Sequence, residues 1–178
     1  MLLYKYSKRE KRGLIMGKLF EEIKFFEEKV SKLMRKPTIE IIYKDFGTGK
    51  DVIYNNNKLY INSNNIKELS NALIESIIRE SRTHYQELVI TNKITNRINE
   101  STKMKWENEF PNRDIRQSDL NSLSALKKFA LQAIEIDRIA YTEFFINAYL
   151  GLKMNYDLPS WLRVEVNKRK DEIKYECF

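Results

Sequence analysis

Cysteine, histidine and long apolar runs are scarce in this chain. Its 178 residues include one cysteine, Cys177, and one histidine, His84. A single cysteine cannot form a disulfide within the chain, so we expect a reducing, cytoplasmic location. No apolar run approaches the roughly 20 residues of a membrane-spanning helix. The apolar start at residues 1–3 is too short for a signal peptide. The sequence therefore predicts a soluble protein without membrane contact.

The composition of the chain is that of a globular domain. Hydrophobic residues make up 42% and aromatic residues 12%, which is enough apolar surface to build a core without metal or disulfide support. We find no internal repeat, low-complexity segment or linker. Residues 16–178 are therefore expected to form a single domain.

The positive charge is concentrated at the start of the chain. Residues 1–15 contribute +4 of the net charge of +7, because five bases stand against one acid: Lys5, Lys8, Arg9, Lys11 and Arg12 against Glu10. We expect residues 1–15 to form a basic N-terminal arm, either flexible or an upstream extension that precedes a start at Met16. Such an arm is either a solvated tail or a binding site for nucleic-acid phosphates.

Apolar periodicity predicts an α+β fold. A helix is expected over residues 18–34, then strands over 38–43, 51–54 and 58–62 that form a small three-stranded sheet. The next helix runs from a cap at Asn64 or Asn65 to residue 88. Residues 91–119 are expected as a packed loop anchored by Trp106, Phe110 and Pro111. A third helix spans 120–152 with Gly151 as a C-cap, and a short helix begins at residue 159.

Two segments carry the strongest functional signal. Residues 79–86 read RESRTHYQ, and residues 132–141 read QAIEIDRIAY. The first resembles the metal helix of small bacterial and phage zincin metallopeptidases, with the pattern HExRHxxQ. The second resembles their downstream segment, PxExDAxxFA. The resemblance covers about residues 18–152 and implies a zincin-like fold, with two long core helices beside a small sheet.

The resemblance also implies that the metal ligands have been lost. In zincins two histidines four residues apart hold zinc, and the glutamate after the first activates a water. Those histidine positions are Arg79 and Thr83 here, while Glu80 keeps the glutamate position and Arg82 and Gln86 keep the flanking ones. Arginine stays protonated and threonine is not a usual zinc ligand. The third ligand position is Glu135 or Asp137. We therefore expect a vestigial site with no metal, no cofactor and no catalytic residue.

His84 leaves an alternative open. With Glu80 and Asp137 or Glu135 it would make a displaced zinc site, and the chain would be a metal-dependent hydrolase. Since each helical residue turns by about 100°, His84 points away from the face of Arg79 and Thr83. A buried, hydrogen-bonded histidine is the competing interpretation.

An arginine is expected to replace the lost metal. Asp137 lies on the inward stripe of its helix, where an unpaired carboxylate is costly. Arg79 or Arg82 would then hold Glu80 together with Glu135 or Asp137 in a charge-assisted network. Alternatively, these acids form ordinary helix-surface pairs, such as Glu135 with Arg138.

Three functions follow from these features. The first is a catalytically inactive zincin-like protein that acts by contact with another protein, as a regulatory or anti-host protein of a phage or mobile element. The second is the hydrolase with displaced zinc ligands. The third is a nucleic-acid-binding protein that uses the basic arm.

Overall fold

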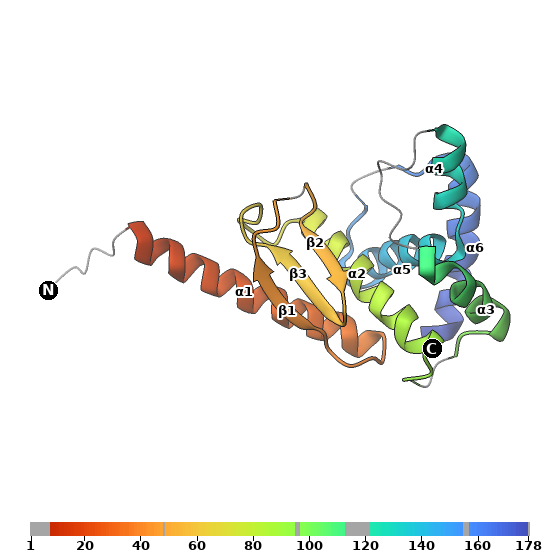
Figure 1. Cartoon of the computed structure of the whole chain (residues 1–178), viewed down its shortest axis with the longest axis horizontal. Coiled ribbons are helices and arrows are strands. Elements are labelled where there is room, and N and C mark those ends of the chain that lie inside the picture. The colour runs from red at the N-terminus through yellow and green to blue at the C-terminus, as the bar shows by residue number, and fades with distance from the viewer. Residues whose placement is uncertain (1–7, 48, 95–96, 113–121, 155–156, 178) are drawn as a thin grey trace, which may run out of the picture.

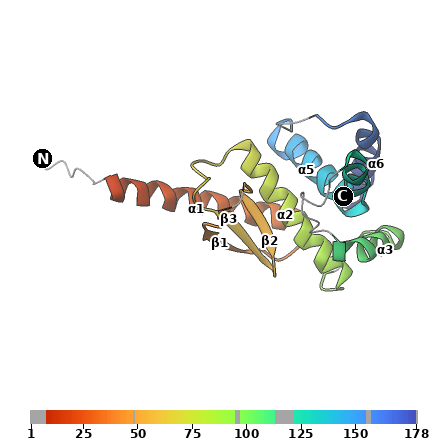
Figure 2. The ribbon, with the colours of Figure 1, turned by 45° about the horizontal axis from the view of Figure 1, so that its top comes forward.

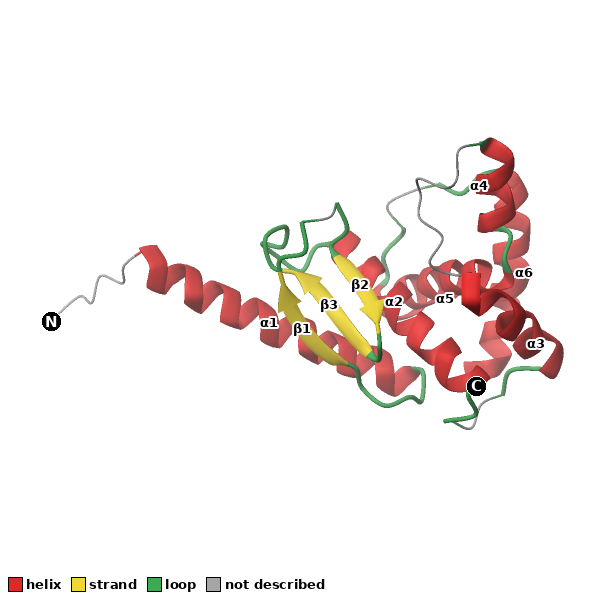
Figure 3. Ribbon diagram, in the orientation of Figure 1, coloured by secondary structure: helices red, strands yellow, loops and turns green. Residues whose placement is uncertain are grey.

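The computed structural model describes residues 8–47, 49–94, 97–112, 122–154 and 157–177 (Figures 1 and 3). These residues form six α-helices and one three-stranded sheet, so the α+β prediction is confirmed. The helices are α1 (Lys8–Leu33), α2 (Asn71–Ile90), α3 (Glu100–Glu109), α4 (Leu123–Ala130), α5 (Ala133–Leu150) and α6 (Ser160–Cys177), with a 3-10 turn η1 at Phe110–Asn112. The strands are β1 (Glu40–Lys44), β2 (Val52–Asn55) and β3 (Lys58–Asn62).

The sheet has the strand order β1-β3-β2 and is mixed. β3 pairs in parallel with β1 and antiparallel with β2. The β2–β3 hairpin turns through Asn56 and Asn57, whose φ values are +50° and +59°. Asparagine tolerates this left-handed conformation better than most residues. The predicted hairpin is confirmed: β2 is shifted by one residue, and β3 has the predicted bounds.

Helix α1 begins ten residues before the predicted start. It crosses one face of the sheet, and its N-terminal part projects beyond the sheet (Figures 1 and 2). Residues 8–15, which we expected to belong to a separate arm, are therefore helical. Lysine, arginine and glutamate are good helix formers, and extending an existing helix is much easier than nucleating one. Residues 1–7 lie outside the described part of the chain.

Helix α2 does not begin at either predicted cap. Ser70 is its N-cap, and the Ser70 Oγ accepts a hydrogen bond from the Leu73 amide at 3.3 Å. Asn64 and Asn65 lie in the preceding turn instead. The prediction was wrong because serine and asparagine cap equally well, and the sequence offers all three residues.

Residues 91–119 are not a continuous loop. Asn99 caps α3, with its Oδ1 accepting from the Thr102 amide at 2.8 Å. Trp106 is fully buried and does anchor the segment, as predicted. It is the one buried residue of α3, so no apolar stripe at helical spacing marks this helix in the sequence. Residues 113–121 lie outside the described part of the chain.

The helix predicted over 120–152 is two helices. The helical conformation is interrupted at residues 131–132, between α4 and α5. None of the residues of α4 is buried. The apolar spacing runs through the break, so the periodicity missed it. Gly151 ends α5 with a φ of +65°, which confirms the predicted C-cap. Helix α6 has 18 residues and is not the short helix we expected.

One hydrophobic core joins the sheet to the helices. It includes Ile23 and Val30 of α1, Leu59 of β3, Ile77 of α2 and Val166 of α6, each fully buried. No helix among the described residues is long and apolar enough to cross a membrane. Helices α2, α5 and α6 pack on this core. The sides on which they face one another carry the charged residues described next.

Candidate functional site

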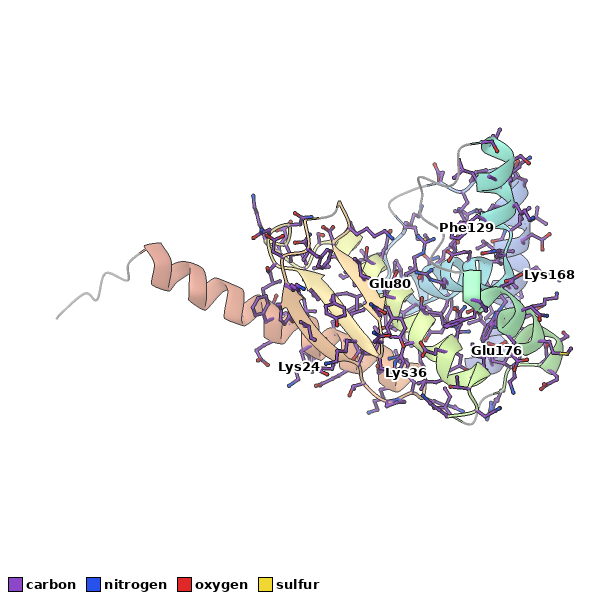
Figure 4. The ribbon with its side chains drawn as sticks, viewed as in Figure 1. Lys24, Lys36, Glu80, Phe129, Lys168 and Glu176 are labelled. Carbon is purple, nitrogen blue, oxygen red and sulfur yellow. The ribbon has the colours of Figure 1, made fainter. Side chains whose placement is uncertain are left out.

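Charged side chains from three helices meet inside the protein. We call this set the arginine–carboxylate network. It extends from Glu80, next to the sheet, to Glu176, on the side away from it (Figure 4). Its members are Arg79, Glu80 and Arg82 of α2, Glu135, Asp137 and Arg138 of α5, and Arg169 and Glu176 of α6.

Asp137 is the centre of the inner half of the network. It is fully buried. Arg82 donates to it twice, from Nε at 2.8 Å and from Nη2 at 2.9 Å, in the bidentate geometry that suits a carboxylate. Arg169 Nε and Gln86 Nε2 each donate at 2.8 Å. Four donors therefore surround the two oxygens, which leaves little capacity for a metal ion.

Arg82 is held by aromatic rings as well as by acids. Its guanidinium carbon lies 4.3 Å from the centre of the Tyr85 ring and 4.4 Å from that of Tyr141. The centre of the Trp106 ring lies 5.7 Å from the guanidinium carbon of Arg82 and 5.7 Å from that of Arg169. A cation over a ring face is attracted by the ring quadrupole, and more strongly when water is excluded. These rings compensate part of the desolvation cost of the buried guanidinium.

The charges at the centre hold one another in the ionised state. Burial alone would raise the pKa of Asp137, but Arg82 and Arg169 outweigh burial and lower it below 3.8. Burial alone would lower the pKa of Arg82, and Asp137 reverses that shift. The pair is therefore ionised at neutral pH, although Arg82 is only 3% exposed.

The outer half of the network is organised by Arg138. Its Nη1 lies 2.6 Å from Glu135 Oε1, and its Nη2 lies 2.6 Å from Glu80 Oε1. Arg79 Nη2 reaches the other oxygen of Glu135 at 3.3 Å. The backbone amide of Tyr54 on β2 donates to Glu80 Oε2 at 3.3 Å. Both oxygens of Glu80 are therefore engaged.

The structure brings the expected acids and arginines together, with different pairings. Arg79 contacts Glu135, and Arg82 contacts Asp137. The residue that bridges Glu80 to an acid of α5 is Arg138, which contacts both Glu80 and Glu135. The alternative Glu135–Arg138 pair exists too, but Glu135 is 2% exposed, so it is not a surface pair.

Sequence reasoning missed Arg138 as the bridge and missed both α6 residues. Arg138 was visible three residues after Glu135, but only as a local helix pair. Arg169 and Glu176 are 32 and 39 residues beyond Asp137, on a helix that we expected to be short. A signal was present, since Arg169 stands three residues after Val166 and four before Ile173, which are both fully buried.

Arg79 and Thr83, the positions that the predicted resemblance compares with the zincin histidines, lie one turn apart on α2. Thr83 is 3% exposed, and its hydroxyl donates to the Arg79 carbonyl at 3.3 Å. Arg79 is partly exposed and extends to Glu135. Neither side chain is a usual zinc ligand.

His84 lies on a different side of α2 and is buried, as we predicted. Its ring is 5.5 Å from that of Tyr54, and Nδ1 has no hydrogen-bond partner among the described residues. The expectation of a fully hydrogen-bonded histidine was therefore wrong for this atom. Burial, with help from Lys36 and Lys93, lowers the pKa of His84 to about 4.

The displaced zinc site is not assembled. The structure does not bring Glu80, His84 and Asp137 together as a metal-binding group, and no other set of three His, Cys, Asp or Glu side chains does so in the described ranges. Asp137 is instead bound by arginines, and Glu80 by Arg138 and Tyr54.

A second buried ionic group lies between α1, α2 and the chain before β1. The Lys36 ammonium is 3.0 Å from Glu27 Oε1, with both side chains at 1% exposure or less. The hydroxyls of Ser31 and Ser81 also bond to Glu27. With no opening to solvent at the ammonium, we interpret this group as structural.

In comparisons with known proteins, no protein-family model, curated protein or solved structure matches this chain.

Proposed function

We propose that this chain is a catalytically inactive, zincin-like protein that acts by contact with another protein. The observation that carries the proposal is the state of Glu80. In a zincin the corresponding glutamate activates a metal-bound water and needs a carboxylate that is available to it. Here Arg138 binds one oxygen at 2.6 Å and the Tyr54 amide binds the other. Glu80 acts as a structural acceptor instead of a base.

The network supplies the positive charge that a zinc ion would supply. Zinc in such a site ties a pair of ligands on one helix to an acid on the next. Here Arg138 joins Glu80 to Glu135, and Arg82 joins α2 to Asp137. Charge-assisted hydrogen bonds of this kind hold two helices in register without a metal. The core helices therefore stay docked although the metal chemistry is lost.

The zincin-like frame and the protein partner rest on the resemblance of residues 79–86 and 132–141, extended by the arrangement around them. The order of a long helix, a small sheet, α2, a Trp106-containing segment and α5 supports that frame. A regulatory or anti-host role in a phage or mobile element follows from the same resemblance. Fold alone does not determine function, so these statements need direct tests.

The decisive test restores the two histidines. In the Arg79→His, Thr83→His double variant, the new side chains stand four residues apart and share one helix face, with Glu135 adjacent to the Arg79 position. We expect the wild-type protein to purify without zinc. The double variant should bind one Zn²⁺, as measured by elemental mass spectrometry and by competition with a chromophoric chelator.

The matched control is Arg79→Ala, Thr83→Ala, which removes the same side chains without adding ligands and should bind no zinc. If the folded double variant binds no more zinc than this control, the zincin-like frame is wrong. If wild-type protein carries stoichiometric zinc that is lost in Glu80→Ala, the chain is a metalloprotein and the inactive assignment fails.

A second candidate function is supported by the projecting part of α1. Residues 8–12 carry four bases and one acid, on a helix that extends away from the sheet (Figures 1 and 2). Such a helix suits the phosphates of nucleic acid. If it binds them, deleting residues 1–15 should abolish a strongly salt-dependent affinity for duplex DNA or RNA. An affinity unaffected by the deletion would exclude this role for α1.

A further inference from the structure

Strand β1 has an outer edge with hydrogen-bonding groups that face away from the sheet. In a parallel pair, alternate residues direct their backbone groups to the neighbouring strand. The Ser63 amide donates to the Lys44 carbonyl at 3.4 Å, so Lys44, and with it Ile42 and Glu40, face β3. The amides and carbonyls of Ile41 and Tyr43 consequently point outward.

The outer edge of β1 is the open edge of the sheet. The opposite edge, β2, lies beside α2 and gives its Tyr54 amide to Glu80. Among the described residues, no strand lies on the outer side of β1, and α1 crosses the face of the sheet (Figures 1 and 2). Just before β1, the outward amide of Ile39 donates to Glu27 Oε2 at 3.3 Å. An open edge of this kind is a template for another strand.

The side chains of β1 divide between two faces. Tyr43 stacks on Phe20 of α1 with ring centres 3.6 Å apart, so odd-numbered residues face α1. Side chains alternate along a strand, and Glu40, Ile42 and Lys44 therefore share the other face. Glu40 and Lys44 are exposed and Ile42 is partly exposed. The free face of β1 thus reads acid, apolar, base.

This order is complementary to itself when it is reversed. We propose that β1 pairs antiparallel with β1 of a second copy of this chain, about a twofold axis at Ile42. Glu40 then lies opposite Lys44 of the other copy, twice by symmetry, and Ile42 lies opposite Ile42. These are the non-hydrogen-bonded pairs of the ladder, in which side chains approach most closely.

The backbone follows the same register. With Ile42 on the axis, Ile41 lies opposite Tyr43 of the other copy, and both have outward-facing groups. The pair exchanges two hydrogen bonds, and symmetry doubles them. A shift by one residue would oppose outward groups to inward ones and would break the charge pairing. Backbone parity and side-chain charge therefore select the same register.

Charges on an edge strand usually deter pairing with other strands. Here they deter strands of a different charge order and fit only a strand with the reversed one, which a second copy supplies. Lys58 on β3 already lies 3.1 Å from Glu40 Oε2. It would stand beside the Glu40–Lys44 pair in the dimer and orient its carboxylate. The dimer would contain one continuous six-stranded sheet. Its formation does not depend on the arginine–carboxylate network.

The test is sedimentation equilibrium of the full chain over a wide concentration range. The interface is small, so we expect weak association, with mass rising from 21.3 kDa toward twice that value at high concentration. Lys44→Glu places like charges opposite each other twice and should raise the dimer dissociation constant about tenfold or more. Glu40→Lys should do the same. Lys105→Glu on the distant helix α3 makes the same charge change as Lys44→Glu and should leave association unchanged.

Mixing the two variants gives the sharpest readout. Lys44→Glu carries two acids on the free face of β1, and Glu40→Lys carries two bases. An equimolar mixture should therefore associate more tightly than either variant alone. The inference is overturned if the wild-type chain stays monomeric up to about 1 mM. It is also overturned if Lys44→Glu associates like Lys105→Glu, or if the mixture associates no better than its components.

Discussion

Replacing Asp137 by asparagine should cost this protein much of its stability. The substitution keeps the size of the side chain and removes its charge. Arg82 and Arg169 then remain buried, at 3% and 6% exposure, opposite a neutral amide. The asparagine nitrogen is a donor, and it would face donors from Arg82, Arg169 or Gln86, which all point at Asp137 in the wild-type protein.

The expected magnitude follows from the burial of the group. Breaking a buried ion pair by neutralising one partner typically costs about 3–5 kcal/mol, because the remaining charge is left uncompensated. Domains of this kind are stable by roughly 5–15 kcal/mol in total. Asp137→Asn should therefore remove a large part of the free energy of unfolding. Its effect should also depend on pH, since the pKa of Asp137 is lowered below 3.8 by the two arginines.

The sign of the pH dependence is fixed by that lowered pKa. A carboxyl group with a lower pKa in the folded state stabilises the fold above its unfolded pKa and loses this contribution as pH falls through the folded value. The contribution is thus complete only above about pH 5 and is lost progressively in stronger acid. Wild-type protein and Asp137→Asn should differ most at neutral pH and converge at the acid end.

The assay is urea unfolding followed by circular dichroism, at neutral pH and at acid pH. Asp171→Asn is the control, because it also neutralises an aspartate that pairs with a cation, Lys174 at 2.7 Å, but on the exposed side of α6. It should leave the urea midpoint unchanged. If Asp137→Asn lowers the free energy of unfolding at neutral pH by less than about 1 kcal/mol, as for a surface pair, the buried-network argument is refuted.

Two further predictions concern other buried charges. The pKa of His84 is lowered from 6.5 to about 4 in the folded protein. As pH drops, His84 is therefore protonated in the unfolded chain before it is protonated in the folded one. The free energy of unfolding should consequently fall between pH 6.5 and pH 4. His84→Leu should remove that slope, and NMR of the only histidine should show no titration above about pH 5; a normal titration near 6.5 would contradict its burial. Lys36→Met leaves Glu27 without its cation, and urea unfolding should show a loss of about 3–5 kcal/mol that Lys36→Met with Glu27→Gln largely recovers; equal losses in the single and double variants would show that the pair is not coupled.

Local structure was predictable where a residue type has few conformational options. The asparagine turn between β2 and β3 and the C-cap at Gly151 both follow from the positive φ that these residues tolerate. Helix α3 was not predictable in the same way. It buries only Trp106, and one buried residue has no period. The break between α4 and α5 was missed because the apolar spacing continues across it.

The network shows the same division. An inward-facing Asp137 needed a positive partner, and this could be said from the sequence alone because an isolated buried carboxylate is too costly. Which arginine supplies the charge depended on distances between helices. The sequence predicts Arg138 only as a local helix pair with Glu135, and it gives no reason to bring Arg169 of α6 to Asp137.

The amino-acid sequence alone predicts the α+β class, the hairpin and the inward position of Asp137, and it shows that positions 79 and 83 hold no histidine. These are consequences of local conformational preference and of side-chain chemistry, which no packing arrangement changes. Helix packing, which the sequence does not reveal, brings Arg82 and Arg169 to Asp137 and Arg138 to Glu80. Those pairings join residues that are 32 to 58 positions apart, and ion pairs at such separations are set by how helices pack.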